Sequence, residues 1–133
     1  MSAPSPLTAT LLVALGGGVG AALRYQTGRV IQAIVGIDAV FPWPTLAVNV
    51  VGSLAMGVLA GWLARNGSGG ESLRLLLGVG LLGGYTTFSA FSLEIALLIE
   101  RGQIGLAATY AAAAVVAGAV GLFAGLAMMR GTA

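Results

Sequence analysis

Long uncharged stretches divide this chain into four segments. Its charged residues leave positions 1–23, 39–64, 75–93 and 102–129 without a formal charge, and each stretch has at least 19 residues. A helix needs roughly 20 apolar residues to cross the hydrocarbon core of a bilayer. Only 8% of the residues are charged, far below the roughly 25% of a soluble domain. The sequence therefore predicts an all-α integral membrane protein with four transmembrane helices.

We expect these helices to form one domain over residues 1–133, with no soluble domain beside it. Proline suits the first turn of a helix, so the first span is expected at about 6–35. The other spans are expected at about 45–65, 72–99 and 103–129. No lysine or arginine precedes the first apolar stretch, so it is interpreted as a retained span rather than a signal peptide.

Missing residue types exclude several functions. The chain has no cysteine and no histidine, which removes thiolate and imidazole catalysis and the usual ligands of zinc, copper and iron. It also has no carboxylate pair at catalytic spacing and no phosphate-binding loop, so we do not expect an enzyme. Its six scattered arginines form no basic stripe, so nucleic acid is not an expected partner.

Glycine is unusually frequent, with 22 residues. Small residues let helices approach closely in lipid, where no hydrophobic drive holds them together. Glycines four residues apart recur in every expected span, and we predict tight helix packing at these pairs: Gly16/Gly20, Gly57/Gly61, Gly80/Gly84 and Gly121/Gly125.

One glycine cluster is not explained by packing. Residues 83–89, GGYTTFS, place two glycines and three small hydroxyl side chains in the middle of the third span. Paired glycine and β-branched threonine are poor formers of a helix interior, so we predict a break in the third helix. Broken backbone at membrane depth is tolerated only where it is buried in protein or lines a cavity. The working site is therefore expected here.

The arginines show no bias between the two membrane faces. With four spans, one face collects Arg65, Arg74 and Arg130, and the other collects Arg24, Arg29 and Arg101. Orientation depends on an asymmetry of positive charge, and this chain has none. We therefore hypothesise insertion in both orientations and an antiparallel homodimer. The alternative is a monomer with a weak topological preference.

Two polar residues of the first two spans are candidates for the site, because polar groups inside spans are costly and tend to be functional. Asn49 is the only amide deep in the second span; it could serve the site or simply form an interhelical hydrogen bond. Arg24, near the end of the first span, could attract an anion to a vestibule or extend to the membrane interface.

The other candidates surround the expected break. Phe88 and Phe91 share a helical face beside the hydroxyls of Thr87 and Ser89, and an aromatic ring has a positive edge that can meet an anion. Tyr110, in the fourth span, could place its hydroxyl in the same pathway or only pack. Glu94 could be solvated near a mouth or pair with an arginine. These groups favour the passage of an ion.

Three segments carry a resemblance to a known family. GGGVGAALRY, PTLAVNVVGS and GLLGGYTTFSAFSLE, in this order along the chain, resemble the signature segments of the bacterial fluoride ion channels, the CrcB/Fluc family. The GGxTTFSxF pattern is the most specific of them. The resemblance implies passive fluoride export across the bacterial inner membrane by a dual-topology homodimer with two antiparallel pores, surrounded by lipid.

The resemblance also assigns roles to residues. It implies that Asn49, Phe88 and Phe91 line the fluoride path, with Tyr110 from the fourth helix. It further implies a structural sodium ion at the dimer centre, held by backbone carbonyls of Gly83 and Thr86 from both subunits. Thr87 and Ser89 would belong to the hydroxyl lining, and Glu94 to its outer end. Hard cations such as sodium suit oxygen ligands.

Two departures from the family pattern concern the pore lining. Serines often follow the fourth-span tyrosine by one and two turns, where this chain has Ala114 and Gly118. Pro44 stands where a glycine often precedes the TLxVN segment. The first departure shortens the hydroxyl track, or other groups complete it.

Two other functions remain as alternatives. A small proton-coupled multidrug exporter also has four spans and dual topology, but it needs a carboxylate in the first span, and this chain has none there. A structural membrane subunit that only packs against a partner would leave the GGYTTFS segment unexplained.

Overall fold

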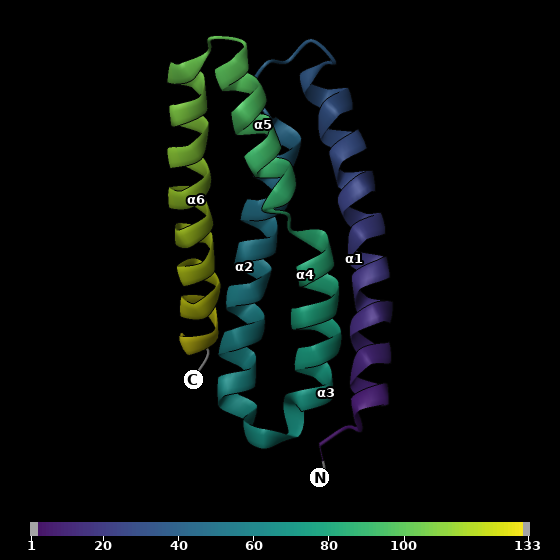
Figure 1. Ribbon diagram of the computed structural model, residues 1–133. Coiled ribbons are helices and arrows are strands. Elements are labelled where there is room, and N and C mark those ends of the chain that lie inside the picture. The colour runs from purple at the N-terminus through teal and green to yellow at the C-terminus, as the bar shows by residue number, and fades with distance from the viewer. Residues whose placement is uncertain (1–2, 132–133) are drawn as a thin grey trace.

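A computed structural model describes residues 3–131 of the chain. Four apolar helical spans lie in this part, at Pro6–Val35, Trp43–Asn66, Glu71–Glu100 and Ile104–Arg130. They run alternately up and down, so that both ends of the chain and the connection between the second and third spans lie at the same end of the bundle (Figure 1). The chain is therefore a multi-pass membrane protein.

The first two spans are continuous helices with recognisable ends. α1 (Pro6–Val35) begins at Ser5, whose hydroxyl accepts a hydrogen bond from the Thr8 backbone N–H at 3.2 Å. This is a typical N-cap, and Pro6 follows it at the first helical position. α2 (Trp43–Asn66) likewise has a proline in its first turn.

The third span consists of several segments. After the short turn η1 (Gly67–Gly70) come α3 (Glu71–Leu73), the π-helical segment η2 (Arg74–Leu82) and α4 (Gly83–Tyr85). The backbone then leaves the helix at Thr86, which is extended with φ −77° and ψ 159°. The span resumes as α5 (Ser89–Glu100), and α6 (Ile104–Arg130) follows. The predicted break in the third helix is confirmed.

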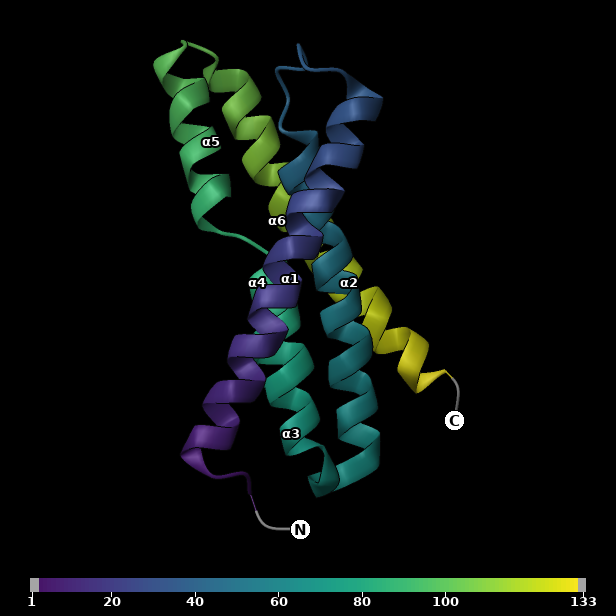
Figure 2. The same ribbon diagram turned by 90° about the vertical axis from the view of Figure 1, so that its right-hand side faces the viewer.

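The third span changes its packing partner at this break. Its first half, η2 and α4, packs against α1, whereas α5 packs against α6. Figure 2 shows α5 turned away from the line of α3 and α4. α2 lies between the two halves and makes its most extensive contact with α6. The break therefore lies beside α2, at the centre of the helix bundle.

Glycines make the two main helix contacts possible. A Cβ atom on Gly20 would collide with the Leu81 carbonyl of η2, and one on Gly84 would collide with the Gly17 carbonyl of α1. Between α2 and α6, a Cβ on Gly57 or Gly125 would collide with a carbonyl of the facing helix. The predicted role of the spaced glycines in helix packing is confirmed.

Little of the described chain is buried. The core cluster of the described chain consists of Leu98, Ala107 and Tyr110, between α5 and α6. Many large apolar side chains of all four spans face outward. This arrangement is expected of helices whose surroundings are lipid or another subunit.

Candidate functional site

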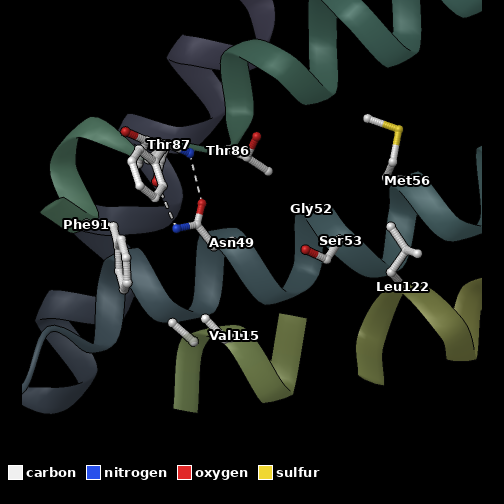
Figure 3. A pocket seen from close by; sticks show the side chains of 11 residues that line it. Asn49, Gly52, Ser53, Met56, Thr86, Thr87, Phe91, Val115 and Leu122 are labelled. Atoms are coloured by element: carbon white, nitrogen blue, oxygen red, sulfur yellow. Dashed lines mark hydrogen bonds between the residues drawn. The ribbon is translucent and has the colours of Figure 1, made fainter. Parts of the chain in front are cut away.

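The broken backbone of the third span is held by one side chain of α2. The Thr87 N–H donates to Asn49 Oδ1 at 2.8 Å, and Asn49 Nδ2 donates to the Thr87 carbonyl at 2.9 Å. Figure 3 shows this reciprocal pair. An amide can donate and accept at once, so Asn49 satisfies a peptide group that the helix no longer serves. The interhelical hydrogen bond considered for Asn49 is therefore present.

The break also releases carbonyl groups from the helical ladder, among them those of Gly83 and Thr86. In a continuous α-helix the Thr87 N–H would bond the Gly83 carbonyl, and the Ala90 N–H would bond the Thr86 carbonyl. Here Thr87 donates to Asn49, and Ala90 donates to the Thr87 hydroxyl at 3.2 Å. Gly83 is exposed and Thr86 is half-buried. These two carbonyl oxygens are thus available to another partner.

A cleft of about 350 Å³ opens beside the break, between α2, α5 and α6. No charged side chain lines it in the described part of the chain. Four of the expected pore residues do: Asn49, Thr87, Phe88 and Phe91. The two phenyl rings have their centroids 5.7 Å apart and are tilted by 42°. Phe88 is 78% exposed, so much of its ring lies at the surface of the helix bundle.

Tyr110 lies behind this cleft and not on its wall. Its side chain is fully buried, and the edge of its ring meets Phe91 at a centroid distance of 5.2 Å. Its hydroxyl donates to Glu94 Oε2 at 2.7 Å, while the Thr45 hydroxyl donates to Glu94 Oε1 at 2.6 Å. Glu94 therefore accepts hydrogen bonds from two hydroxyls. This differs from both predicted environments, which were solvation near a mouth and pairing with an arginine.

Ser89 is at the first residue of α5 and is exposed. Its Oγ lies 3.4 Å from the Thr87 Oγ1. Ser89 is not among the residues that line the cleft, so the break brings it close to Thr87 without turning it toward Asn49.

Arg24 lines a second cleft, of about 320 Å³, on the other side of the break. Its walls come from α1, α2 and the backbone around Thr87, and they include the Thr45 side chain. Thr87 borders both clefts. We expected Arg24 near the end of the first span. It lies about three turns before the end of α1 and is therefore deeper in the span than expected. This second cleft places a cation on one approach to the break.

Several residues of α2 that were not predicted as site residues also line the first cleft. Gly52, Ser53 and Met56 follow Asn49 at the spacing of one helical face. Their spacing from Asn49 could have indicated them, since positions i+3, i+4 and i+7 share the helical face of residue i. Gly52 has a definite role, because a Cβ atom there would collide with the Thr86 methyl group. Its missing side chain leaves room for the Thr86 side chain at the break.

Comparison with known proteins gives a consistent result. Residues 11–126 match the family described as CrcB-like protein, Camphor Resistance (CrcB). A protein of Novosphingobium aromaticivorans named fluoride-specific ion channel FluC is 71% identical over 96% of this chain and 100% of its own length. A Rhodospirillum centenum protein of the same name is 54% identical over 90% of this chain and 94% of its own. Nitrobacter hamburgensis has a fluoride-specific ion channel FluC 2 that is 53% identical over 90% and 95%.

Proposed function

The chain belongs to the CrcB-like protein family, and on this premise we propose that it is a fluoride channel of the membrane and not an enzyme. The observation that carries the proposal is the uncharged cleft beside the broken third span, with Asn49, Thr87 and two phenyl rings on its wall. The channel gives fluoride a passive way out of a bacterial cell across the inner membrane.

The lining suits a small and strongly hydrated anion. Fluoride enters a narrow path only where donors replace the water that it loses, and it leaves only where no fixed charge holds it too tightly. Amide N–H groups, hydroxyls and the positive edges of phenyl rings are neutral donors. The cleft has all three types. Arg24 raises the anion concentration in the second cleft without entering the first.

The conducting unit is an antiparallel homodimer with two pores. Three observations support it: the equal division of arginines between the two ends, the 78% exposure of Phe88, and the opening of its cleft at the subunit surface. A phenyl ring at the mouth of an open cleft contributes to a closed path only when a second surface covers it. A second copy in the opposite orientation supplies that surface, together with lipid around the assembly.

A structural sodium ion lies between the two broken helices of the dimer. The donors are the carbonyl oxygens of Gly83 and Thr86, which are among those that lose their helical N–H partners at the break. Uncharged carbonyl oxygens are suitable ligands for a hard cation. The ion would neutralise the partial negative charge that four such carbonyls bring together, and the same residues of both subunits would hold it.

Fluoride efflux from liposomes tests the proposed function. Purified protein should release fluoride rapidly without a proton gradient and should pass little chloride, and a fluoride electrode measures both the rate and the selectivity. Efflux that requires a proton gradient would favour the multidrug-exporter class, and no efflux would favour a structural subunit.

A matched pair of variants tests the site. Phe88→Ile removes the positive ring edge from the cleft and should nearly abolish efflux. Phe123→Ile, at a similarly exposed phenylalanine of α6 (68%) outside the cleft, should leave efflux intact. Equal rates in the two variants would remove Phe88 from the pathway.

A further inference from the structure

Ser53 occupies the next turn of α2 after Asn49. The two residues are four positions apart on the same face, which separates them by about 6 Å along the helix axis. Both line the 350 Å³ cleft, and Figure 3 shows the Ser53 side chain in the space between α2 and the segment of α6 that carries Val115 and Leu122. Ser53 therefore lies on the side of Asn49 toward the chain termini.

The Ser53 hydroxyl differs from several other small hydroxyls inside the spans. A serine or threonine within a helix commonly donates to the carbonyl four residues earlier. Thr10, Ser92 and Thr109 do so here, at 2.8–2.9 Å. Within residues 3–131, no protein group shares a hydrogen bond with the Ser53 hydroxyl. Its donor is thus free to bind something in the cleft.

The facing wall of α6 supplies no hydroxyl at this level. A Cβ atom built on Gly118 would lie 3.5 Å from Ser53 Oγ, so the two positions face each other across the helix contact. Ala114, one turn earlier on α6, also lines the cleft. Since neither residue has a polar side chain, Ser53 is the only side-chain donor on the α2 and α6 walls of the described cleft between Asn49 and the apolar end at Met56 and Leu122. The Thr86 hydroxyl, on the third wall, already donates to the Leu82 carbonyl at 2.9 Å.

We propose that Ser53 is a second fluoride-stabilising donor, which extends the path one turn beyond Asn49. This inference rests on the proposed channel function. Because the donor comes from α2, the hydroxyl track of this chain continues along α2 where α6 has Ala114 and Gly118. Fluoride that leaves the Asn49 amide toward the end of the bundle with the termini meets the Ser53 O–H next.

Three variants measured by liposome efflux test this assignment. Ser53→Ala should lower the fluoride rate about tenfold or more, the effect of losing one hydrogen bond to a charged group. Ser53→Thr keeps the hydroxyl and should retain most of the rate. In the double variant S53A/G118S, a hydroxyl returns from the opposite wall, and we expect most of the lost rate to return with it.

Thr109→Val is the matched control, because it removes a span hydroxyl that is already bonded to the Gly105 carbonyl; it should conduct as the parent chain does. A Ser53→Ala rate equal to that of the parent would overturn the assignment. The assignment would also be overturned if Ser53→Thr and S53A/G118S, which keep or restore a hydroxyl, both conducted as slowly as Ser53→Ala. A structural role of Ser53 would then explain the loss. The parent chain is measured first, and its failure to conduct fluoride would count against the proposed function itself.

Discussion

At the scale of the residue, Asn49 combines two roles that looked like alternatives in the sequence. Its amide oxygen and nitrogen each make one hydrogen bond to the Thr87 peptide. An amide has two N–H donors and two acceptor lone pairs, so one N–H remains after the Thr87 carbonyl is served. Asn49 also lines the cleft. The same side chain can therefore hold the break open and offer a donor to an anion.

Asn49→Asp tests the hydrogen-bonding role of this side chain, because it keeps the shape and packing of the amide and removes its N–H donors. A carboxylate has the shape of the amide, but it donates no hydrogen bond and repels both the Thr87 carbonyl and an anion. Fluoride efflux should fall about tenfold or more, because the N–H donor to fluoride is lost and the carboxylate repels the anion. Asn66→Asp, at the exposed end of α2, is the control and should conduct normally. Similar rates for the two variants would show that the Asn49 amide is dispensable.

At the scale of the element, glycine decides how closely the first half of the third span approaches α1. Gly20 faces the backbone of η2, so that an added Cβ would meet the Leu81 carbonyl, whereas Gly18 has nothing within 4 Å of such an atom. Both glycines lie in the interior of α1. Substitution at both positions changes the helix propensity equally, but only at Gly20 does it disturb a close helix contact. Comparing the two therefore isolates the cost of that contact.

Gly20→Ala should destabilise the protein by about 1–3 kcal/mol, the usual cost of forcing an extra methyl group into a packed contact. Gly18→Ala should leave stability unchanged or raise it by about 0.5–1 kcal/mol, because alanine is the better helix former. Thermal unfolding in detergent, followed by the loss of monodisperse protein, measures the difference. Equal midpoints would mean that the approach of α1 to η2 is not tight.

The proposed sodium site at the break in the third span can be tested through the dependence of protein stability on sodium. If the Gly83 and Thr86 carbonyls hold sodium in the folded dimer, removing the ion destabilises that state by mass action. At a sodium concentration of about 100 times the dissociation constant, bound ion contributes about 2.7 kcal/mol. Protein prepared with an organic cation in place of sodium should melt at a lower temperature, and added sodium should restore the midpoint. Identical melting in both salts would contradict the site.

At the scale of the whole molecule, charge is distributed evenly between the two ends. Arg65, Arg74 and Arg130 lie at the ends of α2, η2 and α6 nearest the chain termini, whereas Arg24 and Arg29 in the second half of α1, and Arg101 after α5, lie toward the other end. Positive charge near span ends sets the orientation of a membrane protein, while acidic residues contribute little. An equal division gives the insertion machinery no reason to prefer one orientation.

Both orientations should therefore coexist in cells. The chain has no cysteine, so Asp38→Cys introduces a single thiol in the exposed connection between α1 and α2. A membrane-impermeant thiol reagent should label only part of the protein in intact cells and all of it after lysis. Complete labelling, or none, in intact cells would establish one orientation and exclude an antiparallel dimer.

The sequence alone determined the features that depend on local chemistry. The length and polarity of each stretch predicted the four spans, because a helix in lipid must satisfy its own backbone and present apolar side chains. The composition of residues 83–89 predicted the break, because glycine and β-branched residues weaken a helix wherever it lies. The spaced glycines likewise predicted where helices pack, since the absence of a side chain is itself a local property.

Only the tertiary structure decided which side chains meet. Lipid is as apolar as a helix interface, so the pattern of an apolar span does not distinguish the face that packs from the face that meets lipid. The pairing of Asn49 with Thr87, the hydroxyl partners of Glu94 and the burial of Tyr110 all depend on that choice. So does the place of Ser53, which faces the cleft only because α6 crosses α2 with Gly118 beside it.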